Sequence, residues 1–202
     1  MVDFFVQGGG FMWPILIALL FGLAIIGERA YSLINSSSDT DQFFEDVKTI
    51  YNDSGKEQAI EFCENSPGPV ASIFYAGLSK IQKSKEEIEK AVQNAGGLEM
   101  AFLEKNMIWI NSVITIAPML GFTGTVVGMI KAFEDIKMAN DISPAVVAGG
   151  ISQALLTTAF GLIVAMIMQV AQNFFVSMID KLILDMEEQS IKIVEYLHSS
   201  KK

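Results

Sequence analysis

Three long stretches without a charged residue interrupt this 202-residue sequence. They cover residues 9–27, 106–130 and 142–179, which are 19, 25 and 38 residues long. A helix needs about 20 predominantly apolar residues to cross a bilayer. The third stretch is longer than one crossing but too short for two crossings and a turn. The pattern therefore predicts an all-α membrane protein with three transmembrane helices, the third of which continues beyond the membrane.

The signals at the ends of these stretches agree with spanning helices. Trp13 lies near the start of the first stretch and Trp109 near the start of the second, where amphipathic rings prefer the headgroup region. Ser143-Pro144 combines a capping hydroxyl with a proline suited to the first helical position. We therefore expect the third helix to begin at Pro144.

Lysine and arginine are distributed unequally between the two sides of the membrane. Twelve of the fourteen lie in 29–105 and 181–202, and only Lys131 and Lys137 lie between the second and third stretches. Cytoplasmic loops carry an excess of these residues, which predicts that the N-terminus lies outside and the C-terminus inside. We expect an outer N-terminus (1–8), a first span (9–27) and a cytoplasmic helical loop (28–105). A second span (106–130), a short outer loop (131–143), a third span (144–175) and a cytoplasmic helical tail (176–202) follow.

The long cytoplasmic loop reads as several helices. Ser84 followed by Glu87 forms a capping box, which predicts a helix from that point toward the second span. Pro67-Gly68-Pro69 predicts a break between shorter helices, and Gly96-Gly97 predicts a bend. Beyond Asp180 apolar residues recur at helical spacing, so the third helix is expected to extend well into the cytoplasm.

The amino-acid composition argues against several classes of function. Hydrophobic residues make up 51% of the chain and charged residues 18%, against about 25% charged in ordinary soluble domains. The formal charge of −9 is opposite to the basic footprint of nucleic-acid binding. A single cysteine, Cys63, makes no internal disulfide, and a single histidine, His198, makes no histidine metal site. With no phosphate-binding loop or catalytic constellation either, we expect no enzyme, no metal and no cofactor.

Small residues recur at three- and four-residue steps in the second and third spans. Such spacing lets helix backbones approach closely in lipid, where the hydrophobic effect between helices is absent. Two such stripes favour homo-oligomerisation, although packing within one chain is the plainer explanation. The residues are Gly121, Gly124 and Gly128 in the second span and Gly150, Ala154, Thr158, Gly161 and Ala165 in the third.

Threonines stand among these small residues, at Thr125 and at Thr157–Thr158. A buried threonine is more often structural, with its hydroxyl bonded to a carbonyl one turn back. The alternative is a wet lining, because a hydroxyl both donates to and accepts from water without carrying charge. The spans contain no titratable side chain of the kind that proton relays use. Any ion that crosses here needs water alone or an acid from a partner. Pro118, which we also expect among the helix-packing residues, removes one backbone hydrogen bond and predicts a kink.

Two motifs resemble the signatures of the ExbB/TolQ/MotA family of ion-driven motor stators. Residues 117–130, Ala-Pro-Met-Leu-Gly-Phe-Thr-Gly-Thr-Val-Val-Gly-Met-Ile, resemble the second-span signature. Residues 150–162, Gly-Ile-Ser-Gln-Ala-Leu-Leu-Thr-Thr-Ala-Phe-Gly-Leu, resemble the third-span signature, and the Glu28-Arg29 pair also fits. Together with the three-span layout, the resemblance covers nearly the whole chain and is closest to ExbB.

The resemblance implies a pentamer in the bacterial inner membrane, with a periplasmic N-terminus, around the membrane helices of a dimeric ExbD- or TolR-like partner. The partner would supply a membrane Asp, and a TonB- or TolA-like protein would carry work to the outer membrane. Thr125 and Thr158 match the pore-facing threonines of the family. Many relatives have Glu where this chain has Gln153, and the paired Thr157–Thr158 leaves sodium open as the coupling ion.

Four alternatives to an ExbB-like proton-channel subunit remain open from the sequence. A TolQ-like role in envelope maintenance and a gliding-motility stator are close variants. A non-conducting membrane scaffold belongs to a different class and would use the small-residue stripes for assembly alone. A stand-alone channel would conduct ions without any partner, which the lack of a membrane acid disfavours.

Overall fold

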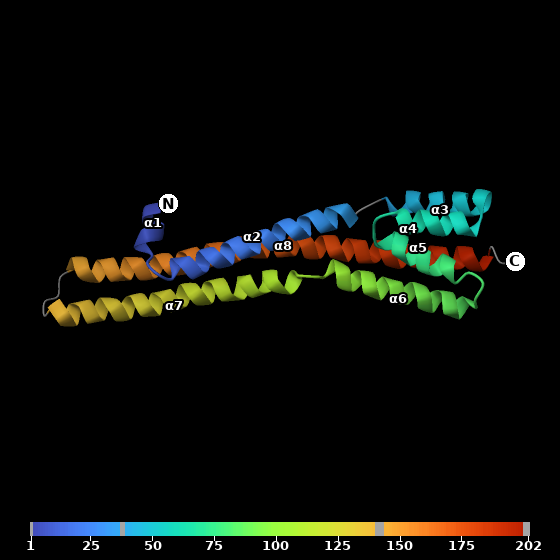
Figure 1. Cartoon of the computed structure of the whole chain (residues 1–202). Coiled ribbons are helices and arrows are strands. Elements are labelled where there is room, and N and C mark those ends of the chain that lie inside the picture. The colour runs from blue at the N-terminus through green and yellow to red at the C-terminus, as the bar shows by residue number, and fades with distance from the viewer. Residues whose placement is uncertain (1, 37–38, 140–143, 200–202) are drawn as a thin grey trace. The chain divides into compact units, whose positions relative to one another are not determined.

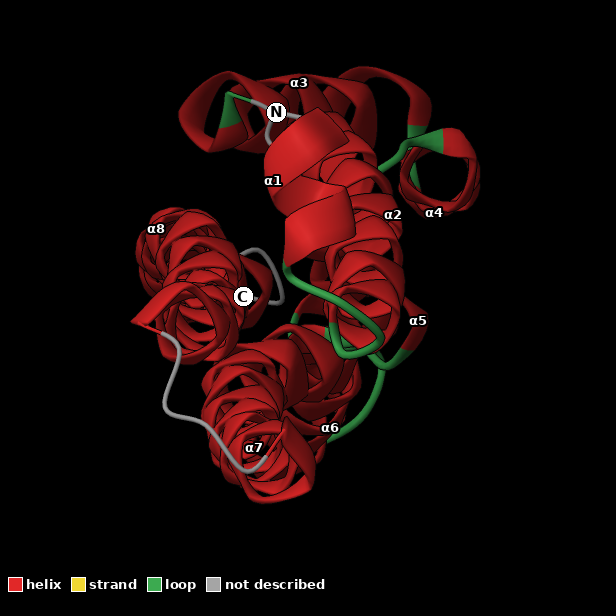
Figure 2. Cartoon of the chain, turned by 90° about the vertical axis from the view of Figure 1, so that its left-hand side faces the viewer, coloured by secondary structure: helices red, strands yellow, loops and turns green. Residues whose placement is uncertain are grey.

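We describe a computed structural model of the chain over residues 2–36, 39–139 and 144–199, in which every regular element is a helix (Figure 1, Figure 2). The helices in chain order are α1 Val2–Gln7, α2 Met12–Ser36, α3 Thr40–Ser54, α4 Lys56–Asn65, α5 Pro69–Ser79, α6 Lys85–Leu103, α7 Met107–Ala139 and α8 Pro144–Ser199. Three helical stretches are long and apolar enough to cross a membrane, within Met12–Ser36, Lys85–Met138 and Ala148–Ser199. The expectation of an all-α protein with three spanning helices is confirmed.

The chain divides into two compact units, which we describe separately. Unit 1 comprises residues 1–28 and 106–174, and unit 2 comprises residues 29–105 and 175–202. The long apolar stretches of the sequence lie almost entirely in unit 1, and most of the charged residues lie in unit 2.

Unit 1 is held together by contacts among α2, α7 and α8. The Cα of Gly22 on α2 lies against the side chain of Met168 on α8, where an added Cβ would be 2.5 Å from the methionine sulfur. Phe21 on α2 and Trp109 on α7 pack edge to face with ring centroids 6.2 Å apart. Large apolar side chains point outward from all three helices: Ile17, Leu20, Met119, Phe122, Met166 and Val170. This apolar exterior is expected of helices that face lipid.

The C-terminal bound of α7 differs from the sequence expectation. Residues 131–139, which we expected in a short loop, continue α7 as far as Ala139. They contain neither glycine nor proline, so nothing in the backbone stops the helix at the end of the apolar stretch. At the other end α6 leads toward the second span as expected, but α6 and α7 are separate helices. Helix α6 ends at Leu103 and α7 begins at Met107, with Asn106 between them in the left-handed region at φ 64°.

Two further expectations concern single residues in these helices. Pro118 lies inside α7, which remains helical through it, and the predicted kink stays a prediction. The helix α8 begins at Pro144 as expected and runs to Ser199. The expected cap at Ser143 lies outside the described residues.

Unit 2 is built around α5, which is apolar on all sides and buries most of its residues. Ile73, Phe74 and Leu78 are fully buried. The Phe74 ring packs against Phe43 and Phe44 of α3. The neighbouring helices of unit 2 cover most of α5, whereas Tyr75 on the same helix remains 40% exposed.

The predicted capping signals of unit 2 are confirmed. The Ser84 hydroxyl accepts from the Glu87 amide at 3.3 Å, and a Glu87 carboxylate oxygen accepts from the Ser84 amide at 3.3 Å. The Pro67-Gly68-Pro69 break separates α4 from α5, with Gly68 at φ 108° and Pro69 at the first helical position. Gly96-Gly97 does not interrupt α6, which continues through both residues.

Cys63 provides a direct test of packing in unit 2. Its thiol is buried on α4, and this burial raises the pKa of the Cys63 thiol to about 12. Since the thiolate is the reactive species, alkylation by iodoacetamide at pH 8 should be roughly a thousandfold slower than for a free cysteine. Mass spectrometry of the native and the denatured chain measures both rates. Equal rates would contradict the buried position.

Candidate functional site

Small residues of α7 and α8 meet along a line that we call the α7–α8 seam. A Cβ built on Gly161 would lie 2.5 Å from the carbonyl oxygen of Ala117, and one on Gly121 would lie 2.8 Å from the carbonyl oxygen of Thr157. Neither position has room for a methyl group, so the two backbones touch. Among the other expected packing residues, Gly124 lies against Thr157, Gly128 against Ala154, and Gly150 against Ala132.

This seam accounts for the small-residue stripes within one chain. The plainer of our two explanations is therefore sufficient for the glycines. They give no separate support for packing between copies, and homo-oligomerisation has to be argued from other observations.

Three hydroxyl groups gather in the middle of the seam, and we call them the threonine cluster. Thr125 on α7 and Thr158 on α8 are in hydrogen-bond contact through their Oγ1 atoms. Thr158 also donates to the carbonyl oxygen of Gly121 at 3.1 Å. Thr157 is buried and donates to the carbonyl oxygen of Ala154 at 2.7 Å. The expected pathway residues Thr125, Thr157 and Thr158 thus lie together.

The three protons of the threonine cluster can be arranged so that one oxygen stays open. Three hydroxyls supply three protons. Two arrangements fit the distances. Either Thr125 donates to the carbonyl oxygen of Ala154 at 3.0 Å and Thr158 donates to Thr125, or Thr158 donates to Gly121 and Thr125 donates to Thr158. In the second arrangement no cluster proton is directed at the Thr125 oxygen, whose lone pairs can accept from water or face a cation. Hard cations prefer neutral or anionic oxygen ligands of this kind.

Thr123 shows what a threonine outside the cluster does. It precedes Thr125 by two residues on α7, is exposed, and donates to the carbonyl oxygen of Met119 in its own helix at 2.8 Å. Spacing alone does not separate Thr123 from Thr125, because both stand between glycines. The structure separates them, since only Thr125 reaches α8.

Gln153, the fourth expected pathway residue, lies apart from the cluster. Its side-chain amide nitrogen lies against Gly9, at a place that a Cβ on Gly9 would occupy. Gly9 has φ +74° in the turn between α1 and α2, a conformation that favours glycine. Gln153 therefore packs against this turn, and its role in an ion pathway stays a prediction.

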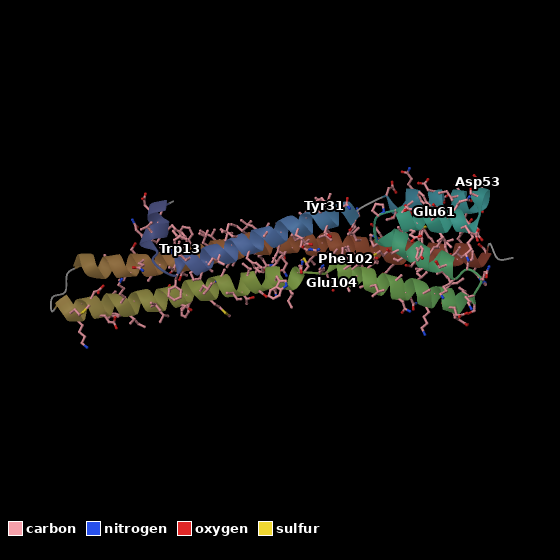
Figure 3. The ribbon with its side chains drawn as sticks, in the orientation of Figure 1. Trp13, Tyr31, Asp53, Glu61, Phe102 and Glu104 are labelled. Carbon is pink, nitrogen blue, oxygen red and sulfur yellow. The ribbon has the colours of Figure 1, made fainter. Side chains whose placement is uncertain are left out.

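Arg29 and Asn106 have roles that sequence reasoning missed. The Arg29 side chain is 1% exposed, and its Nη1 donates to the carbonyl oxygens of Phe102 at 3.4 Å and Leu103 at 3.3 Å. It thus satisfies the last carbonyls of α6 at the negative end of the helix, the end at which Phe102 and Glu104 are labelled in Figure 3. In unit 1, Asn106 Nδ2 donates to Glu28 Oε2 at 3.2 Å. In the sequence, the feature that could have indicated these roles is the acid–base pair Glu28-Arg29 at the end of an apolar stretch.

Fold and site together define a multi-pass membrane protein with a neutral, hydroxyl-lined seam between two spanning helices. Residues 65–188 match the model of the MotA/TolQ/ExbB proton channel family. This match covers more than half of the chain and includes α7 and most of α8. The chain belongs to the MotA/TolQ/ExbB proton channel family.

Some of the similar proteins are named as ExbB proteins and others as TolQ proteins. An ExbB-like biopolymer transport protein of Synechocystis sp. is 28% identical over 92% of this chain and 90% of its own length. An ExbB homolog of Methanothermobacter thermautotrophicus is 28% identical over 89% of this chain and 64% of its own length. The Tol-Pal system protein TolQ of Pseudomonas aeruginosa is 26% identical over 64% of this chain and 58% of its own length.

Proposed function

We propose that this chain is the subunit of an ion-driven motor complex whose ion pathway runs beside the threonine cluster. The observation that supports this most is the Thr125 oxygen, whose lone pairs are free to accept when Thr125 donates to Thr158, on a helix seam within charge-free stretches of the sequence. Family membership supports the same conclusion, because the family is described as a proton channel family.

The pathway requires a second polypeptide. The three apolar stretches contain no Asp, Glu, Lys, Arg or His, so the chain has no titratable carrier of its own within the membrane. We propose that an ExbD- or TolR-like one-span partner presents a carboxylate to the threonine cluster, within a homopentamer. One charge moving down 100 mV releases about 2.3 kcal/mol, which is enough to bias a small rearrangement.

Orientation and biological role are part of the proposal. The excess of lysine and arginine in 29–105 and 181–202 supports a periplasmic N-terminus and a cytoplasmic unit 2 in a bacterial inner membrane. We propose that the complex energises TonB-dependent transport at the outer membrane, in keeping with the bacterial relative named as an ExbB-like biopolymer transport protein. The TolQ-named relative keeps an envelope-maintenance role as the close variant.

The Thr158→Val substitution tests the proposal. Valine keeps the shape of threonine but removes the hydroxyl from the contact with Thr125. We expect ion flux to fall at least about tenfold, which is of the order seen when one placed polar group is lost. Flux is measured with a pH- or sodium-sensitive dye in proteoliposomes that contain the chain and its one-span partner. Thr158→Ser should retain flux because it restores the hydroxyl.

Thr123→Val is the matched control, because Thr123 lies on the same helix turn as Thr125 but bonds only within α7. It should leave flux unchanged. Size-exclusion chromatography checks that each variant assembles as the wild type does. Unchanged flux in an assembled Thr158→Val complex would defeat the proposal.

One observation favours a non-conducting scaffold instead. Every hydroxyl of the threonine cluster can be satisfied by a neighbouring carbonyl or hydroxyl, as in a purely structural contact. A scaffold predicts that Thr158→Val changes stability but not flux. Reconstitution of this chain without any partner separates a third possibility, a stand-alone channel, for which we expect almost no flux.

A further inference from the structure

Two adjoining cavities lie between α6 and the C-terminal half of α8, both inside unit 2. Their volumes are about 330 and 440 Å³. Val92 and Gln93 of α6 and Ser190 and Ile191 of α8 line both of them, so they form one continuous groove. We call it the α6–α8 groove.

The floor of the groove is apolar, and on the α6 side two positions carry no side chain. Ile73, Val92 and Met186 line it and are almost completely buried. On α6, Gly96 and Gly97 stand where other helix positions would carry side chains, and a Cβ on Gly97 would meet nothing within 4 Å. Ile191 lines the groove while remaining 62% exposed. The groove thus offers apolar surface that the described part of unit 2 leaves uncovered.

The charge around the groove is negative. Glu89, Glu187 and Glu195 line it, against a single base, Lys85. Lys85 pairs with Glu89 on its own helix, with Nζ and Oε1 3.5 Å apart. Unit 2 as a whole has eighteen acidic and twelve Lys or Arg residues, a formal charge of −6. An occupant of the groove therefore gains from positive charge.

We propose that the α6–α8 groove binds a cationic amphipathic helix of a partner protein. Its apolar face would cover Ile191 and Met100, which are exposed, and its lysines or arginines would meet Glu187 and Glu195. On α6 the groove extends from Lys85 to Met100, which is about 22 Å at 1.5 Å per residue and matches a helix of about 15 residues. A helix laid into an apolar groove by one face is a common form of peptide recognition.

The negative charge of unit 2 argues against a second copy as the occupant. Another unit 2 would bring a further formal charge of −6 to an acidic groove. Like charges brought together at an interface make binding less favourable, so a second unit 2 is a poor fit for the groove. The proposal is independent of the ion pathway, since binding to unit 2 can be measured without flux.

The test uses the full chain in phosphatidylcholine nanodiscs, which carry no net lipid charge. The probe is a fluorescein-labelled 15-residue peptide with leucines on one helical face and lysines on the other. Its twin has glutamate in place of lysine. Fluorescence anisotropy should show saturable binding of the Leu/Lys peptide and at least tenfold weaker binding of the Leu/Glu peptide. Empty nanodiscs measure binding to lipid alone.

Two kinds of variant locate the binding. Gly97→Leu fills the groove, and Asn94→Leu adds the same side chain to an exposed position of α6 outside the groove lining. Glu187→Lys with Glu195→Lys reverses two groove charges. Glu61→Lys with Glu64→Lys makes the same change in net charge on α4, where Glu61 is marked in Figure 3. We expect each groove variant to weaken binding at least tenfold and each control to change it less than twofold.

Circular dichroism checks the helical content of every variant. If Gly97→Leu does not fold, the two charge variants carry the test alone. Three results would overturn the proposal. The first is Leu/Lys peptide binding that Gly97→Leu or the groove charge reversal leaves intact. The second is peptide binding that the α4 control weakens as much as the groove charge reversal does. The third is a change in the number of copies per particle with Gly97→Leu, which would identify a second copy as the occupant.

Discussion

Replacing Gly161 by alanine should separate α7 from α8 and destabilise unit 1. The new methyl group would lie 2.5 Å from the carbonyl oxygen of Ala117, which belongs to the backbone and has no rotamer to change. Overpacking of this kind costs about 1–3 kcal/mol. For a chain of this size that corresponds to a fall of roughly 2–12 °C in the unfolding temperature. Circular dichroism of the detergent-solubilised chain during heating measures it.

Gly27→Ala is the matched control for Gly161→Ala. Gly27 lies inside α2, and a Cβ there would meet nothing within 4 Å. Both substitutions add one methyl group to a glycine in a helix, so the difference between them isolates the clash at the seam. Gly128→Ala should fall between the two, because its Cβ would lie 3.1 Å from that of Ala154. Equal unfolding temperatures for Gly161→Ala and Gly27→Ala would refute the close approach of α7 and α8.

Replacing Arg29 by methionine should free the end of α6. Methionine preserves much of the apolar stem but removes the donors that serve the carbonyls of Phe102 and Leu103. A buried hydrogen bond from a charged donor contributes about 1.5–3 kcal/mol. We therefore expect trypsin to cleave after Lys105, directly beyond α6, at least about tenfold faster than in the wild type.

Lys90→Met controls for the lost charge, because Lys90 is an exposed residue of α6. It should leave the cleavage rate after Lys105 unchanged. Mass spectrometry of timed digests gives both rates. If Arg29→Met digests at the wild-type rate, the guanidinium does not hold the end of α6.

The threonines show how far spacing carries a prediction. The sequence places Thr123 and Thr125 among the same glycines, and hydropathy treats them alike. In the structure Thr125 bonds across the seam, whereas Thr123 bonds within its own helix. Two residues along a helix differ by about 200° in direction, so they face opposite sides. Which side meets α8 depends on the rotation of α7, which local sequence does not determine.

Gln153 and Arg29 make contacts that sequence patterns do not predict. The importance of Gln153 was inferred from a family motif, but its contact with Gly9 joins residues 144 positions apart. Arg29 reads as a charge that closes an apolar stretch, yet it serves carbonyls more than 70 residues away. Contacts of this range depend on tertiary packing and leave no periodic trace in the sequence.

The sequence by itself determined the features that follow from chain-local physics. These are three charge-free stretches of membrane length, the capping box at Ser84, the break at Pro67–Pro69, and the absence of any titratable group in the spans. Only the tertiary structure decided which small residues touch, that the glycine stripes meet each other within one chain, and that Thr125 is directed at Thr158. The reason is that hydropathy and capping act over a few residues, whereas the seam depends on the relative rotation and register of two helices.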